Sequence, residues 1–184
     1  MAITYFGLCD SSGNPSGAAA ANTGSAETDW NTSQVYTCPG SGTQVIQEIS
    51  ADVKNVTNYN IRLAVYDVTG ATLIAQGTAA VAVSGAADSW QGHLTAANIT
   101  PNPANLTGGT NYIIAITSSG DTQTNHAVSG GTDKFSATDD TGGFPASLPA
   151  GSAASVLFPV RVGVQPPGSG FPGLLSVPLT LVIT

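Results

Sequence analysis

Apolar and polar residues alternate along most of the chain, with the period of two that a β-strand shows when one face is buried. Between residues 43 and 55, the odd positions 45, 49, 51 and 53 are apolar and the even positions are polar, with Gln47 and Ile46 as the exceptions. Residues 112–116 are apolar at both parities, which predicts a central strand covered on both sides. The positions predicted to face inward are Val45, Ile49, Val53, Ile61, Leu63, Val65, Ile114, Ile116, Val160 and Val162.

Turn-forming residues separate these runs. Asp67–Gly70 is a tight hairpin signal, residues 55–60 form a short polar loop, and Gly108-Gly109 is a further break. Residues 95–98 could hold one short helical turn. About nine or ten strands result, at the spacing of a sandwich. The pattern predicts an all-β protein, an antiparallel β-sandwich over residues 1–164.

Two segments depart from plain strands. Residues 118–151 are rich in Gly, Thr, Ser and Asp, and the best strand pattern within them is Phe135–Thr138. Residues 165–173 read as a Pro/Gly linker, and residues 174–184 then form an amphipathic strand. Its apolar face consists of Leu175, Val177, Leu179, Leu181 and Ile183. We expect this C-terminal extension to contact another subunit by strand addition, rather than to fold back on its own domain.

Charged side chains are rare in this sequence. Of 184 residues only 8% are charged, and the four basic residues against eleven acidic ones give a net charge of −7. This balance offers no basic patch for phosphates, so we expect no nucleic-acid partner. No apolar run approaches the roughly 20 residues of a membrane span, so we expect no membrane insertion.

The low charge is typical of extracellular proteins, yet the start at Met1 shows no signal-peptide pattern. Two explanations fit. The protein is built in the cytoplasm, assembled into a particle and released by lysis, or Met1 was added to a mature secreted domain.

Few residues suggest chemistry. Cys9 and Cys38 could form one disulfide or remain free thiols, and free thiols fit cytoplasmic assembly better. Four aspartates of the long segment could gather round Ca²⁺ but form no Asp-x-Asp-x-Asp ladder, so we expect no cofactor. These aspartates are Asp121, Asp133, Asp139 and Asp140.

Catalytic and sugar-binding groups are equally sparse. The two histidines, His93 and His126, are interpreted as surface polar groups, and no Gly-x-Ser-x-Gly elbow is present, so we expect no enzyme. Trp30 and Trp90 are candidates for stacking on a sugar, or they cap the core at strand starts.

The order of segments supports a resemblance. The segments are Asn60–Asp67, Leu73–Gly77, a Trp-led strand at Ser89–Leu94, Leu106–Ala115, Phe144–Ala150 and a final Val-rich strand. Over residues 30 to 165 the chain resembles β-sandwich domains, similar to jelly-roll carbohydrate-binding modules, that recur in phage tail-fibre, head-fibre and other virion proteins. The resemblance implies a fold and a place on a particle, and it fixes no catalytic residue.

The leading hypothesis is therefore a non-enzymatic virion structural protein, a capsid-decorating or fibre subunit on the virion surface. Its partners would be the major capsid or another virion protein and its own copies, with a trimer favoured. The alternatives are a carbohydrate-binding module with a glycan ligand, and an extracellular filament subunit that uses strand exchange.

Overall fold

The computed structural model describes residues 2–16, 32–55, 58–120, 123–124, 126, 128–129, 142–148, 156–157 and 159–168. Several sequence predictions concern residues outside these ranges. They are the ones on Trp30, Asp121, Asp133, Asp139, Asp140, the strand at residues 135–138 and the C-terminal segment 174–184.

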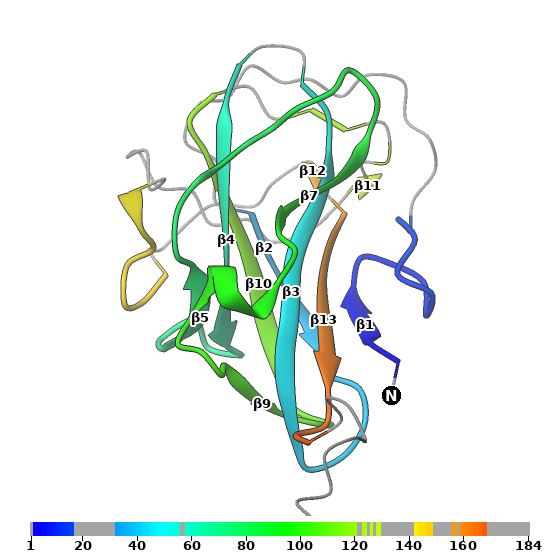
Figure 1. Ribbon diagram of the computed structural model, residues 1–184, viewed down its shortest axis with the longest axis vertical. Coiled ribbons are helices and arrows are strands. Elements are labelled where there is room, and N and C mark those ends of the chain that lie inside the picture. Colours follow the sequence, from blue (N-terminus) through cyan, green and yellow to red (C-terminus); the bar gives the residue numbers. More distant parts are fainter. Residues whose placement is uncertain are drawn as a thin grey trace, which may run out of the picture.

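The described residues form an all-β antiparallel sandwich of two main sheets (Figure 1). One sheet has the order β1 (Thr4–Gly7), β13 (Val160–Gln165), β3 (Thr43–Val53) and β7 (Ser89–His93), and β9 (Asn105–Thr107) also pairs with β3. The other has the order β2 (Thr32–Thr37), β10 (Asn111–Ser118), β4 (Asn60–Asp67), β5 (Leu73–Gly77) and β8 (Ile99–Thr100), and β6 (Val81–Ala82) pairs with β4. A small third sheet joins β11 (Val128–Ser129) to β12 (Val156–Leu157).

The predicted fold class is confirmed, and the strands are more numerous than the nine or ten expected. The extra ones, such as β6, β8, β11 and β12, are two residues long and too short to show a period. The final Val-rich segment, predicted as one strand, is divided between β12 and β13, with Pro159 between them. The predicted turns hold: Gly70 closes the β4–β5 hairpin at φ +71°, and η1 (Ala96–Asn98) is the short helical turn.

The main core lies between the two sheets, and nine of the ten predicted inward side chains are buried in it. Val45 is the exception, because it is half-buried. The reason is a β-bulge: Gly163 pairs with Glu48 and Val164 with Ile46, so Gln47 is an extra residue in β3. Before the bulge, the even-numbered residues of β3 face inward instead of the odd-numbered ones. Ile46, predicted to face outward, is therefore buried.

A second apolar cluster covers the outer face of the β2–β10–β4–β5–β8 sheet. Its buried members are Ala64, Tyr66, Ile113, Ala115, Phe144 and Leu148. The Tyr66 hydroxyl donates a hydrogen bond to the Pro145 carbonyl at 2.6 Å, and its ring meets the edge of Phe144. This cover buries both faces of β10, as the apolar run at residues 112–116 predicts.

Candidate functional site

The outer face of the β1–β13–β3–β7 sheet carries a buried cluster of polar and aromatic side chains. Neighbours across strands point to the same side of a sheet. Ser50 lies opposite Arg161, and Asp52 lies opposite Trp90. The alternation predicts that this side of β3 faces solvent, but Ser50 and Asp52 are 0% and 2% exposed. Other parts of the chain therefore cover this face.

Arg161 is the centre of this cover, which we call the Arg161 stack. Its guanidinium lies 4.5 Å from the ring centroid of Tyr5 and 4.2 Å from that of Trp90. Nε donates to Glu48 Oε1 at 2.8 Å and to Ser50 Oγ at 3.2 Å. An arginine held between two aromatic faces and paired with a carboxylate combines cation–π and ionic stabilisation.

The N-terminal loop closes over this stack because two glycines leave room for it. The Gly13 carbonyl accepts a hydrogen bond from Arg161 Nη1, and a Cβ on Gly13 would lie 2.7 Å from Tyr5 Cδ2. A Cβ on Gly163 would lie 2.9 Å from Glu48 Cγ and 3.1 Å from Tyr5 Cε1. The turn itself is held by Asp10, whose Oδ1 accepts hydrogen bonds from two backbone N–H groups downstream. The Arg161 stack thereby fastens the first residues of the chain to the sheet.

Further along the same face, three side chains form what we call the His126 cluster. His126 Nδ1 lies 2.6 Å from Asp52 Oδ2 and 3.3 Å from Asp88 Oδ2. The two carboxylates are 3% and 6% exposed and the imidazole is 33% exposed. Burial raises the pKa of Asp52, and the hydrogen bond from His126 opposes that rise. Nitrogen and oxygen donors at these distances can act as an ion pair that holds residue 126 on β3, and they are also ligands that divalent metals accept.

Sequence reasoning missed this cluster and misplaced His93, whereas the His126 side chain is 33% exposed. The three residues are far apart in the chain and show no ligand spacing. His93, predicted to lie on the surface, is 1% exposed, and its Nε2 lies 3.3 Å from the backbone N of Leu63. The ring fits there because position 77 is glycine, whose Cβ would lie 1.8 Å from His93 Cε1. Burial, together with the charge of Arg62, lowers the pKa of His93 to about 4.

The tryptophan and cysteine predictions have different outcomes. Trp90 is partly buried, and the Arg161 guanidinium lies over its ring. The indole therefore makes a cation–π contact within the protein. Cys9 and Cys38 are free thiols, so the disulfide that the sequence allowed is not formed. Burial raises the pKa of each thiol to about 11, which keeps both protonated at neutral pH.

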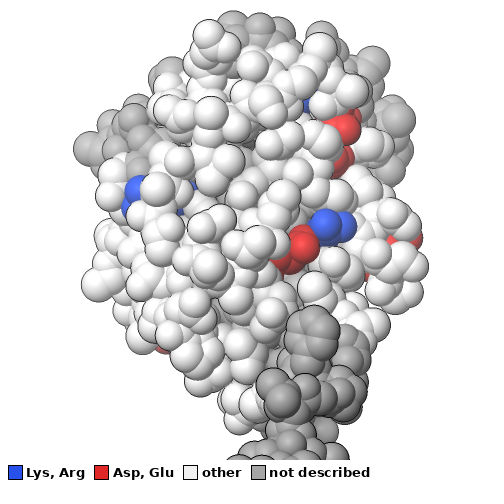
Figure 2. All heavy atoms as spheres, viewed as in Figure 1, with Lys and Arg blue, Asp and Glu red and all other residues white. Residues whose placement is uncertain are grey.

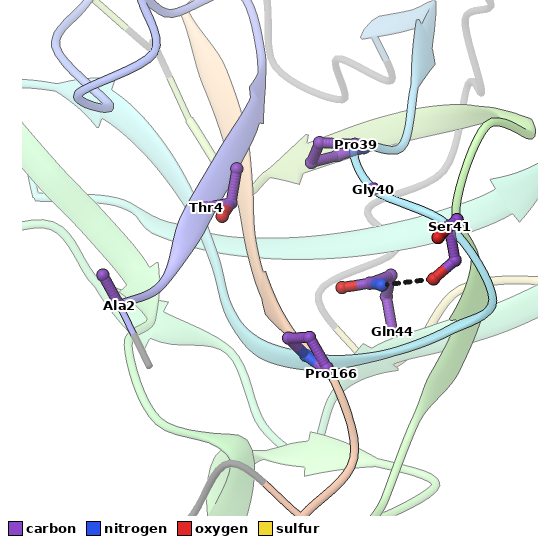
Figure 3. Close-up of a pocket in the computed structure, with 7 residues that line it drawn as sticks. All are labelled: Ala2, Thr4, Pro39, Gly40, Ser41, Gln44 and Pro166. Carbon is purple, nitrogen blue, oxygen red and sulfur yellow. Dashed lines mark hydrogen bonds between the residues drawn. The ribbon is translucent and has the colours of Figure 1, made fainter.

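A hollow of about 310 Å³ lies at the end of the sandwich where β13 ends (Figure 3). It lies between the start of β1, the β2–β3 loop and the residue that follows β13. The lining residues are Ala2, Thr4, Pro39, Gly40, Ser41, Gln44 and Pro166. Within the lining, Gln44 Nε2 donates to the Ser41 carbonyl at 3.0 Å. We call this hollow the end pocket.

No protein family, curated protein or solved structure matches this chain. In the described part of the chain, no helix has the length and apolar character needed to cross a membrane.

Proposed function

We propose that the protein is a non-enzymatic structural subunit of a virion, a capsid-decorating or fibre protein that binds a coat protein and its own copies. Two lines of support come from the sequence: the order of segments that resembles virion sandwich domains, and the amphipathic C-terminal strand. The fold is compatible with the resemblance, because the segments quoted for it include the strands β4, β5, β7 and β10 of one sandwich.

The observation that carries this proposal is the scarcity of exposed charge on the part of the surface that the structure describes. Among the described residues, Asp10 is the one charged residue that is exposed. Glu48, Asp52, Lys54 and Arg62 are buried, the Asp88 side chain is 6% exposed, and Asp67 and Arg161 are half-buried. Figure 2 shows the result on one face, where charged atoms occupy a few small patches of a largely uncharged surface. Uncharged surface loses less hydration energy than charged surface when it is buried, which suits subunits that pack closely.

The buried polar groups support a structural role as well. The Arg161 stack holds the N-terminal loop, and the His126 cluster joins residue 126 to β3 and to Asp88. Each group thus fastens one segment of the chain to another. The orientation of Trp90 toward Arg161 gives no particular support to a sugar platform, so the carbohydrate-binding alternative is kept as an outcome of the test.

The proposal is tested in two ways. Light scattering after size exclusion should show a closed homo-oligomer, with a trimer favoured, and immunogold labelling should mark the surface of particles released by lysis. A stable monomer that binds glycans, with binding lost in Trp90→Ala, would support the carbohydrate-binding module instead. Polymers without a defined size would support a filament subunit. Unlabelled particles would contradict the virion location.

A further inference from the structure

The starting point is the open edge of β1. Within the described residues this strand pairs with β13 alone and ends its sheet. The Val160 carbonyl accepts a hydrogen bond from Leu8, so the even residues of β13 direct their backbone groups toward β1, and their partners Phe6 and Thr4 direct theirs toward β13. Because N–H groups alternate in direction along an antiparallel strand, those of Ile3 and Tyr5 point to the free side. Unpaired groups of this kind are a template for another strand.

The end pocket lies beside the same edge. Ala2 and Thr4 line it, and Thr4 has the parity of Phe6, which is buried in the main core. The end pocket therefore extends the space between the two sheets at the N-terminal end of β1. A strand added to β1 would place alternate side chains on this side, where apolar groups could fill the pocket.

The chain itself leads to this place. Pro166 lines the end pocket, and residues 169–184 follow the last described residue, Gly168. Sixteen residues span up to about 53 Å when extended, at about 3.3 Å each. Residues 174–184 carry the alternating apolar face that begins with Leu175 and Val177. We propose that this segment of a second copy binds the β1 edge as an antiparallel strand, with its apolar face over the end pocket.

The direction of the strands favours a second copy over the chain's own tail. Val164 lies opposite Thr4, so β13 delivers the chain to the starting end of β1. From there the shortest path for the tail of the same molecule runs along β1 in the parallel sense. Every described strand pair is antiparallel, and parallel pairing is slightly less stable per residue. A neighbouring copy can approach from the other end and form the antiparallel ladder.

This inference rests on the self-association in the proposed function, and a complementation experiment tests it. One variant lacks residues 174–184 and keeps its β1 edge. The other carries Thr4→Arg, which places a charged chain at the exposed Thr4 position in the end pocket and keeps the tail. We expect each variant alone to be monomeric by light scattering, and an equal mixture to give one-to-one heterodimers. Ala97→Arg, an equal charge change at an exposed position of η1, should oligomerise like the unmodified protein.

The outcomes separate the two proposals. If the unmodified protein is an oligomer and Thr4→Arg leaves it unchanged, the β1 edge is not the acceptor, while self-association stands. If the unmodified protein is a monomer, self-association itself is wrong. A mixture that stays monomeric, from variants that are each monomeric, would show that the tail does not bind across copies. Should thermal unfolding show that Thr4→Arg does not fold, Ile3→Pro replaces it as the edge variant, because proline removes the N–H group that Ile3 directs to the free side of β1.

Discussion

His93 makes the stability of the sandwich depend on pH. The ring is 1% exposed, its Nε2 lies 3.3 Å from the backbone N of Leu63, and the cation of Arg62 is close enough to disfavour protonation. The pKa of this histidine falls from its ordinary value of 6.5 to about 4 in the folded protein. Between these pH values the unfolded chain binds a proton that the folded protein does not. Stability is therefore complete above the upper value and is lost as the pH falls toward the lower one.

The size of the effect follows from that difference. A shift from 6.5 to about 4, at about 1.4 kcal/mol for each pH unit, corresponds to about 3 kcal/mol of unfolding free energy. Other groups also titrate in acid, so the comparison needs a variant that differs at this position alone. His93→Gln keeps a hydrogen-bond acceptor for the Leu63 N–H and cannot be protonated.

Urea unfolding of both proteins, at a series of pH values from about 7 to about 4, measures the contribution. The free energy of unfolding should fall more steeply for the unmodified protein, by about 3 kcal/mol over the whole range. The control is the slope with respect to urea, which should be equal in the two proteins if both unfold from the same compact state. Parallel pH profiles would refute the reasoning, because they would mean that His93 is protonated equally in the folded and unfolded chain.

The remaining predictions concern the core, the Arg161 stack, the thiols and the tail. Leu63→Ala should reduce the unfolding free energy by about 2–5 kcal/mol in urea titration, since Leu63 is fully buried, and a near-zero change would contradict its place in the core. Arg161→Ala should cost about 3–5 kcal/mol because it leaves Glu48 buried without its cation, and Arg161→Lys should cost less; equal losses would argue against the ion pair. Cys38 is buried and should react with a thiol reagent only after unfolding, whereas the half-buried Cys9 should react slowly in the native protein because its pKa is about 11; rapid labelling of native Cys38 would contradict its burial. Deletion of residues 174–184 should leave the thermal unfolding midpoint unchanged and abolish self-association, whereas a large drop in the midpoint would place the tail in its own core.

The local sequence pattern determined which segments form strands and which face of each strand is buried. A period of two identified β4 and most of β3, and an apolar run at both parities identified β10 as a strand buried on both faces. These predictions held because the alternation of side chains is a property of the strand itself. The hairpin at Asp67–Gly70 held for the same reason, since turn residues act through their own backbone preferences.

Pairing between distant segments decided the rest. Ile46 is buried in place of Val45 because β13 pairs with β3 through a bulge. The residues of β3 alone do not predict that register. His93 is buried because Gly77, from another strand of the opposite sheet, leaves space for the ring. Asp52 lies on β3, Asp88 directly precedes β7 and His126 follows β10, so the three side chains meet only in the folded protein. The sequence by itself therefore determined the all-β class and the inward faces, because these depend on neighbouring residues. Only the tertiary structure decided the bulge, the buried histidine and the polar clusters, because each depends on contacts between residues far apart in the chain.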